Sequence, residues 1–253
     1  MANTGDALSL RSLAILRERI RVPDRYPFTV PTIAALDTLE LRSRVTFFVG
    51  ENGTGKSTLL EGIARACGFN AMGGSENIHG LSSGVGEETP AGRLAETLRL
   101  SWKKKLNTGF FLRAESFYNV ATKLDELQRD DARTLLAYGG TSLHKRSHGE
   151  AFLALAEARF DRAGIYLLDE PEAALSPQRQ LAFLVLLARA LRARDTQFII
   201  ATHSPILLAF PGADILSFDG NTIRRTTYRE TEAFKITSSF TANPEAFLRH
   251  LLG

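Results

Sequence analysis

Two spacings of hydrophobic and polar residues divide the chain into predicted elements. Short, mostly apolar runs with β-branched or aromatic residues predict buried strands at 45–49, 165–168, 197–202 and 215–218. Apolar residues at helical spacing predict helices after the first three of these strands, at 56–68, 177–194 and 207–210. Because strands and helices alternate, we expect an α/β fold with a mostly parallel sheet covered on both faces.

The first 49 residues are predicted to be rich in strands. Strands are predicted at 13–20, where apolar and charged residues alternate toward the end, and at 36–41, before the strand at 45–49. Residues 23–31 hold three prolines, which excludes a central strand or a helix there. A further strand pair is predicted at 98–104 and 109–113. We therefore expect an N-terminal antiparallel β subdomain.

The rest of the chain predicts a small helical lobe and a helical tail. Helices are expected at 116–130 and 150–160, within a lobe inserted at about 114–160. Residues 69–92 contain six glycines, three serines and a proline without a period, which predicts a long loop. Apolar residues at helical spacing in 244–252 predict a helix docked on the core.

Length, charge and cysteine content limit the class of protein. A chain of 253 residues is expected to form a single domain, 1–253, with the lobe inserted. One cysteine excludes an internal disulfide and fits a reducing compartment. No apolar run approaches the ~18 residues of a membrane span, so we expect a cytoplasmic protein without direct membrane insertion. The net charge of +3 is too small to indicate nucleic-acid binding.

A glycine-rich segment between a predicted strand and helix carries the strongest chemical signal. Its sequence, Gly50-Glu51-Asn52-Gly53-Thr54-Gly55-Lys56-Ser57-Thr58, has the spacing of a phosphate-binding loop. The glycines let backbone N–H groups approach a phosphate, and the helix adds its positive N-terminal end. Lys56 is expected to contact the β- and γ-phosphates, and Ser57 to bind Mg²⁺. A nucleoside triphosphate with Mg²⁺ is therefore the predicted ligand, and the predicted nucleotide-binding residues in this loop are Asn52, Gly53, Thr54, Gly55, Lys56, Ser57 and Thr58.

Two acidic residues follow a buried strand later in the chain. The run Ile165-Tyr166-Leu167-Leu168-Asp169-Glu170 places both carboxylates at the carboxyl end of the strand, where open α/β sheets bind ligands. Asp169 is expected to hold Mg²⁺, directly or through water. Glu170 is expected to orient and deprotonate an attacking water, which makes it the main catalytic candidate.

With two further segments the chain resembles the ABC-type ATPases. Ser147-His148-Gly149-Glu150, here called the signature segment, opens a helix 22 positions before Asp169, and His203 lies 34 positions after Asp169. The resemblance covers about residues 10–220. It implies a head-to-tail homodimer with ATP sandwiched between two chains, in which Ser147 and Gly149 contact the partner chain's γ-phosphate. It also implies that His203 contacts the γ-phosphate and the attacking water, so that Glu170, His203 and Lys56 form the catalytic set.

Several positions depart from the transporter members of that family. Their usual Leu-Ser-Gly-Gly-Gln is replaced by Arg146-Ser147-His148-Gly149-Glu150, and Ser176 stands where Asp is common. Arg113-Ala114-Glu115 replaces an expected Gln, and we assign Glu115 to the water or to Mg²⁺. Candidates for stacking on adenine are Tyr26 and Phe28. The chain looks more like the single-domain bacterial AAA-type ATPases near the chromosome-maintenance, recombination-repair and overcoming-lysogenisation-defect branch.

The resemblance implies a mechanism more specifically than a biological role. The leading hypothesis is Mg²⁺-dependent ATP hydrolysis that drives dimerisation and a conformational switch on an unidentified protein partner. One alternative is a regulatory module that binds ATP with little turnover, and another is the energising subunit of a membrane transporter. DNA is a weaker candidate partner, through Lys103-Lys104-Lys105 and Lys145-Arg146, although a solvated surface explains such charges equally well.

Overall fold

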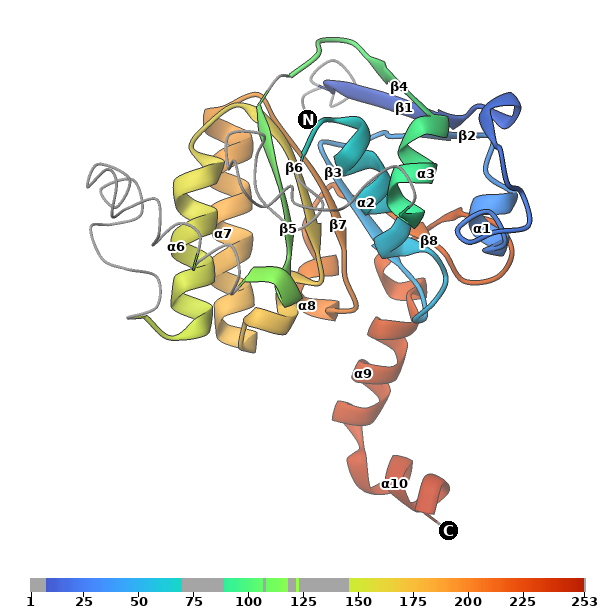
Figure 1. The fold of residues 1–253 in the computed structure, drawn as a ribbon. Helices are drawn as coiled ribbons and strands as arrows, with labels where there is room; N and C mark the ends of the chain where they lie inside the picture. Colours follow the sequence, from blue (N-terminus) through green and yellow to red (C-terminus); the bar gives the residue numbers. More distant parts are fainter. Residues whose placement is uncertain (1–7, 70–88, 107, 118–121, 123–145, 253) are drawn as a thin grey trace.

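The strands of the protein form two sheets (Figure 1). The computed structural model describes residues 8–69, 89–106, 108–117, 122 and 146–252. The smaller sheet is antiparallel, with the strand order β2-β1-β4. The larger sheet has the order β5-β6-β7-β3-β8-β9, parallel except for β9 at its edge. The predicted α/β class and the N-terminal antiparallel subdomain are thus confirmed.

The elements alternate along most of the chain. The strands are β1 (Leu10–Ile15), β2 (Thr38–Glu40), β3 (Val45–Val49), β4 (Leu98–Trp102), β5 (Gly109–Arg113), β6 (Gly164–Asp169), β7 (Thr196–Ala201), β8 (Asp214–Ser217) and β9 (Arg224–Thr226). The α-helices are α1 (Pro31–Ala34), α2 (Lys56–Ala66), α3 (Pro90–Thr97), α6 (His148–Phe160), α7 (Pro177–Ala193), α8 (Pro205–Leu208), α9 (Glu232–Ala242) and α10 (Pro244–Leu252). Short 3-10 turns are η2 (Arg17–Arg19), η3 (Ala114–Ser116), η5 (Pro171–Ala174) and η6 (Tyr228–Glu230).

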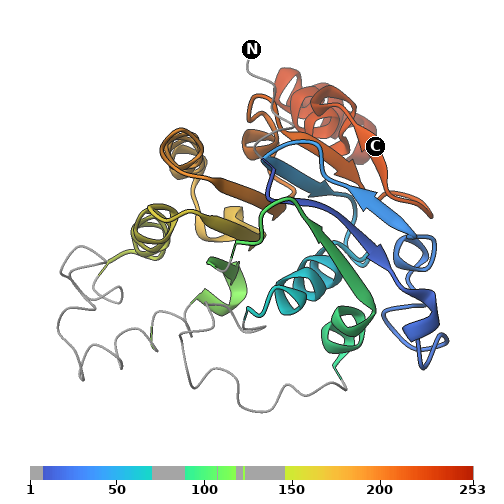
Figure 2. The same ribbon diagram turned by 90° about the horizontal axis from the view of Figure 1, so that it is seen from above.

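Each face of the larger sheet has its own hydrophobic core. On one face, Phe47, Tyr166 and Phe198 pack with α6 and α7. On the other, Phe48 and Leu167 pack with α2, α3 and the smaller sheet. Figure 2 shows α6 and α7 on the opposite side of the sheet from α2 and α3. Successive residues of a strand point to opposite faces, so the apolar runs of the sequence fill both cores.

The predicted strands and helices of the larger sheet are confirmed to within a few residues. Two N-terminal predictions need correction. The strand predicted over 13–20 ends at Ile15 and is followed by η2. The loop predicted over 69–92 ends before α3, because Thr89 caps this helix by accepting the Gly92 N–H at 3.2 Å and Pro90 occupies its first turn. Residues 70–88 of that loop lie outside the described residues.

The strand pair predicted at 98–104 and 109–113 is wrong. β4 pairs with β1 in the smaller sheet, whereas β5 pairs with β6 in the larger one. Both segments have strand patterns, but pairing depends on the position of each strand in the whole fold, which a local pattern does not contain.

The C-terminal tail also differs from expectation. The helix predicted over 244–252 is present as α10, but none of its residues is buried, so it does not dock on the core as predicted. In Figure 1 α9 and α10 project away from the larger sheet. Most of the predicted helix at 116–130 lies outside the described residues, as does much of the lobe expected at 114–160. Within the described ranges, no helix combines the length and the apolar character needed to cross a bilayer.

Candidate functional site

Three adjacent strands bring the predicted chemical groups to one edge of the larger sheet. In the parallel register, Ala201 of β7 lies beside Phe48 of β3 and beside Asp169 of β6. The chain leaves these strands into the phosphate loop, into Glu170 and into Thr202-His203. The carboxyl ends of neighbouring parallel strands share an edge, so segments that are far apart in sequence meet here.

The phosphate loop has the backbone shape that its glycines predict. Gly53 and Gly55 have φ of 82° and 98°, a region in which only glycine is unstrained. Gly55 caps α2, which begins at Lys56. The N–H groups in the first turn of a helix have no intrahelical acceptor, so they are available to a phosphate.

Lys56 is held inside this loop. Its side chain is buried, and Nζ donates to the carbonyl oxygens of Gly50 at 2.6 Å and Glu51 at 2.8 Å. Burial lowers the pKa of Lys56 below its ordinary value of 10.5, while the nearby carboxylates of Glu170 and Asp169 oppose that shift. The ammonium group is thus held by two carbonyl oxygens of its own loop.

Two polar groups outside the loop fix its shape. Asp219, after β8, accepts the Glu51 N–H at 3.0 Å through Oδ1, and Thr32 Oγ1 donates to the Thr54 carbonyl at 2.5 Å. A hollow of about 200 Å³ lies between the loop, His203 and α9. Sequence reasoning missed both supporting residues, because an isolated Thr or Asp in a loop carries no motif.

Ser57 and Asp169, the two residues that the sequence assigns to magnesium together with Glu115, are in direct contact. Ser57 Oγ donates to Asp169 Oδ1 at 2.9 Å, although the residues are 112 positions apart. Asp169 is buried, with 3% of its surface exposed. A hydroxyl and a carboxylate beside a phosphate loop supply the oxygen ligands that Mg²⁺ prefers, so the residues present fit this ion.

Glu170 has a strained backbone that points to function. It is the one non-glycine with positive φ among the described residues, at φ 50° and ψ 52°. This left-handed conformation costs on the order of 1 kcal/mol for a residue with a side chain. It places Oε1 3.9 Å from His203 Nε2, with both side chains about two-fifths exposed. The two predicted catalytic groups therefore lie side by side at the edge of the site.

A third carboxylate, that of Glu172, holds the segment carrying His203. Glu172 Oε1 accepts the His203 backbone N–H at 2.6 Å. Burial raises the pKa of Glu172 above its ordinary value, and the hydrogen bond from His203 offsets part of that shift. The sequence pattern did not identify this role, which depends on the turn η5 facing the end of β7.

The signature segment begins α6, on the opposite face of the sheet from α2. Ser147 is exposed, and Glu150 Oε2 accepts its N–H at 3.0 Å in a capping box. Gly149 is buried, and a side chain there would meet Arg179 and the Ala174 carbonyl. Arg179 also binds Glu150 Oε1 at 2.9 Å. The N-terminus of α6 is thus held in place by η5 and α7.

The assignment of Glu115 remains a prediction. Glu115 is exposed in η3 and, within the described part of the chain, forms no hydrogen bond with Asp169 or Ser57. Its neighbour Arg113 reaches the site instead, because Nε donates to Asp169 Oδ2 at 3.0 Å. The register gives the reason, since Arg113 of β5 lies directly beside Asp169 of β6.

The two candidates for stacking on adenine differ in exposure. Phe28 is buried in the core shared by α2 and the smaller sheet, so its ring is not accessible to a ligand. Tyr26 is 46% exposed, and its hydroxyl is hydrogen-bonded to Thr58 Oγ1 at the start of α2. Tyr26 is therefore the better placed of the two.

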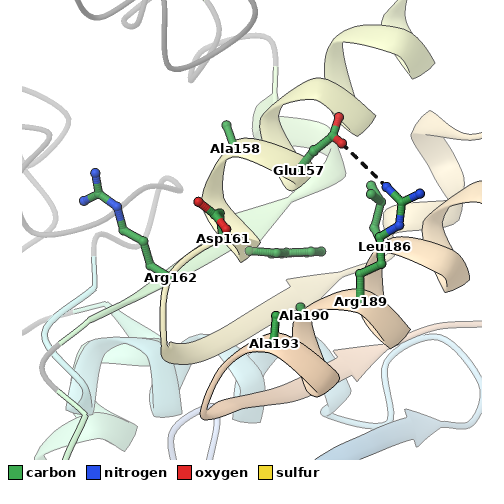
Figure 3. Close-up of a pocket in the computed structure, with 9 residues that line it drawn as sticks. Glu157, Ala158, Asp161, Arg162, Leu186, Arg189, Ala190 and Ala193 are labelled. Atoms are coloured by element: carbon green, nitrogen blue, oxygen red, sulfur yellow. Dashed lines mark ion pairs between the residues drawn. The ribbon is translucent and has the colours of Figure 1, made fainter.

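Another hollow, of about 470 Å³, lies between α6 and α7 (Figure 3). Glu157 and Arg189 form an ion pair of 4.0 Å across it, with both side chains mostly exposed. The hollow lies at the C-terminal halves of α6 and α7. Ser147 and Pro177 lie at the N-terminal ends of these helices, away from it. No residue of the phosphate loop lines it, so it is not part of this site.

Family models match two parts of the chain. Residues 34–132 match a family described as "AAA domain", and residues 148–209 match one described as "AAA domain, putative AbiEii toxin, Type IV TA system". The first range contains the phosphate loop and the second contains Asp169, Glu170 and His203. The two models therefore cover the phosphate loop and the segments that carry Asp169, Glu170 and His203.

Two curated relatives are named as ATP-binding proteins. The xylose import ATP-binding protein XylG of Moorella thermoacetica is 25% identical over 222 residues, which cover 81% of this chain and 44% of that protein. The lipoprotein-releasing system ATP-binding protein LolD of Bordetella pertussis is 27% identical over 229 residues, which cover 82% of this chain and 91% of that protein. The solved structure of the SMC head domain from Thermotoga maritima aligns with a TM-score of 0.45 and 16% identity. The alignment covers 87% of this chain and 99% of that one. The chain thus spans less than half the length of the XylG relative.

The family models and the curated relatives agree with the motifs and with the arrangement of the site. The phosphate loop, the acidic strand end and the His203 segment all occur in the order that the ABC-type resemblance implies. In its motifs and in these matches the chain is similar to ABC-type P-loop ATPases, in agreement with the resemblance seen in the sequence.

Proposed function

We propose that this ABC-type P-loop ATPase domain hydrolyses ATP with Mg²⁺ and works as a dimerisation switch. ATP holds two copies together head to tail, hydrolysis separates them, and the motion acts on a protein partner. The observation that carries the proposal is the meeting of Lys56, Asp169, Glu170 and His203 at one edge of the sheet.

In the proposed binding mode, positive groups of the protein face the negative phosphates of ATP. Lys56 and the first-turn N–H groups of α2 bind the phosphates. Ser57 and Asp169 hold Mg²⁺, which neutralises negative charge on the phosphate oxygens. Tyr26 stacks on the adenine ring from its exposed position beside Thr58.

The catalytic part assigns the proton transfer to Glu170. Its carboxylate is exposed enough to accept a proton from an attacking water, and the strained backbone fixes its direction. His203, 3.9 Å away, donates a hydrogen bond toward the γ-phosphate and orients the same water. Glu172 holds the His203 backbone, so it positions the pair without contacting the substrate.

The location of the signature segment supports the dimer. Ser147 starts a helix on the face opposite to α2, so the two halves of a complete ATP site lie apart on one chain. A second copy turned head to tail brings its Ser147 and Gly149 to the first copy's γ-phosphate. The capping box and the contacts around Gly149 keep this helix end rigid.

Steady-state ATP hydrolysis by two variants tests the proposal. Glu170→Gln is expected to lose at least 100-fold in kcat while keeping its affinity for ATP, because it removes the base and preserves the shape. Lys56→Ala is expected to weaken ATP binding by about 10- to 100-fold, the effect of losing a hydrogen bond to a charged group. Wild-type turnover no greater than that of Lys56→Ala would contradict the proposal and favour a regulatory module that only binds ATP.

A second candidate function follows from the relatives. XylG and LolD are named as ATP-binding proteins of an import and a lipoprotein-releasing system. An energising subunit of a membrane transporter would need a membrane partner, since no described helix of this chain spans a bilayer. Stable co-purification with an integral membrane subunit would support this alternative over a cytoplasmic switch.

DNA remains a weaker hypothesis for the partner. Lys104 is exposed and pairs with Asp195 at 3.4 Å, which reduces the free positive charge near β4. Lys145 lies outside the described residues. Fluorescence anisotropy with a DNA duplex at low salt tests the hypothesis, which requires an affinity that rises with ATP and falls steeply with salt.

A further inference from the structure

Arg113 places a permanent positive charge beside the residues assigned to magnesium. It is the last residue of β5, and the parallel register sets it next to Asp169 at the end of β6. A guanidinium group stays charged at every pH at which a protein is folded. The cation is therefore built into the sheet edge and does not depend on solution conditions.

The contacts of Arg113 link two carboxylates on different elements. Nε donates to Asp169 Oδ2 at 3.0 Å, and Nη2 donates to Glu61 Oε2 on α2 at 3.2 Å. Ser57 Oγ donates to the other oxygen of Asp169, at 2.9 Å. Both oxygens of the Asp169 carboxylate therefore accept hydrogen bonds from this chain's own side chains.

Burial gives this charge arrangement its strength. The exposed fraction of the side chain is 4% for Asp169, 19% for Glu61 and 29% for Arg113. Burial raises the pKa of Glu61, and the charge of Arg113 opposes that shift. Charges that are shielded from water interact more strongly than exposed ones, so Arg113 neutralises much of the negative potential of both carboxylates.

We propose that Arg113 is a resident cation that prevents the nucleotide-free site from binding a divalent metal ion, so that the metal enters only together with a nucleotide triphosphate. Without nucleotide, the charge of Arg113 offsets much of the negative potential of Asp169 and Glu61, and a second cation is repelled by the guanidinium. A triphosphate adds about four negative charges, and this added negative charge makes binding of the metal ion favourable. This inference rests on the proposed ATP and Mg²⁺ function, and it explains what Arg113 does in place of the expected Gln.

Binding of Mn²⁺ to the nucleotide-free protein, measured by electron paramagnetic resonance, tests the proposal. Wild type and Arg113→Lys are expected to bind Mn²⁺ weakly, whereas Arg113→Gln binds it about 10-fold or more tightly, because a nearby charge is removed. Adding Asp169→Asn to Arg113→Gln should reverse that gain, which places the bound ion at this carboxylate. Equal Mn²⁺ affinity of wild type and Arg113→Gln, or a gain that survives Asp169→Asn, overturns the proposal.

A charge-balanced pair of variants covers the case in which Arg113→Gln does not fold. Glu61→Gln with Arg113→Gln removes one charge of each sign, so the pocket keeps the net charge of wild type. Compared with Glu61→Gln alone, the double variant is expected to bind Mn²⁺ about 10-fold more tightly. Equal affinities would overturn the proposal. The measurement uses no ATP turnover, so failure of the proposed hydrolysis would appear separately.

Discussion

Individual side chains in the site divide into groups that are proposed to contact the substrate and groups that hold other residues in place. Lys56, Glu170 and His203 face the edge where phosphates are expected. Glu172 and Arg113 act through hydrogen bonds to His203 and Asp169. The first group follows from motifs, because the chemistry dictates residue type and spacing. The second group does not, because any residue with a suitable hydrogen-bonding atom can fill such a role if the fold brings it near.

The raised pKa of Glu172 predicts a pH dependence of stability. A buried carboxyl whose folded pKa lies above its ordinary 4.5 contributes stability that is complete below that value and is lost as pH rises through the folded pKa. Glu172→Gln keeps an oxygen for the His203 N–H and cannot ionise. We expect its unfolding free energy to fall less than that of wild type as the pH rises above 4.5, because only the wild-type side chain must ionise in a buried position.

Urea denaturation at several pH values measures this difference. Glu61 also has a raised pKa, but it is present in both proteins, so its contribution cancels in the comparison. Parallel curves for wild type and Glu172→Gln would show that Glu172 is not the group responsible.

The positive φ of Glu170 predicts that this residue lowers the stability of the fold while it serves activity. Glycine adopts φ 50° without strain, whereas alanine there keeps the strain of a β-carbon. Glu170→Gly is therefore expected to be more stable than Glu170→Ala by about 1 kcal/mol, and both are expected to lose turnover. Chemical denaturation of the two variants checks the difference. A more stable Glu170→Ala would mean that the residue is not held in the left-handed region.

At the scale of elements, the chain shows which structures its sequence predicts and which it does not. The strands at 45–49 and 165–168 and the helix at 177–194 were predicted nearly to the residue, because buried parallel strands and a long amphipathic helix have strong local patterns. The pairing of β5 with β6 was not predicted, because strand order depends on tertiary contacts. That error hid the contact between Arg113 and Asp169. Similarly, the apolar spacing of α10 predicts a helix but not what covers it.

Close packing at the start of β5 gives a test of its pairing with β6. A methyl group added at Gly109 would overlap the Ile165 carbonyl oxygen and the ring of Phe69. Gly109→Ala is therefore expected to destabilise the protein by about 3 kcal/mol, as overpacking against a backbone atom forces strands apart. Ser101→Ala on an exposed position of β4 serves as the control and should change little. A thermal melt in which Gly109→Ala matches wild type would contradict the pairing.

At the scale of the whole molecule, the two faces of the larger sheet separate the halves of the proposed ATP site. α2 and the phosphate loop belong to one face, and α6 with the signature segment belongs to the other. In the proposed dimer each monomer would supply only one half of an ATP site. The order of motifs predicts such a dimer by resemblance, and the placement of the two helices on opposite faces is consistent with it.

The mass of Glu170→Gln in solution, measured by light scattering with and without MgATP, tests the central claim most directly. Blocked hydrolysis should trap the ATP-bound state, so the mass is expected to rise from one chain of 27.8 kDa to two. Adding Ser147→Arg should abolish the rise, because a bulky charged side chain would block the signature segment from the partner's phosphates. A mass that stays at one chain despite bound ATP would contradict the shared site and the dimerisation switch.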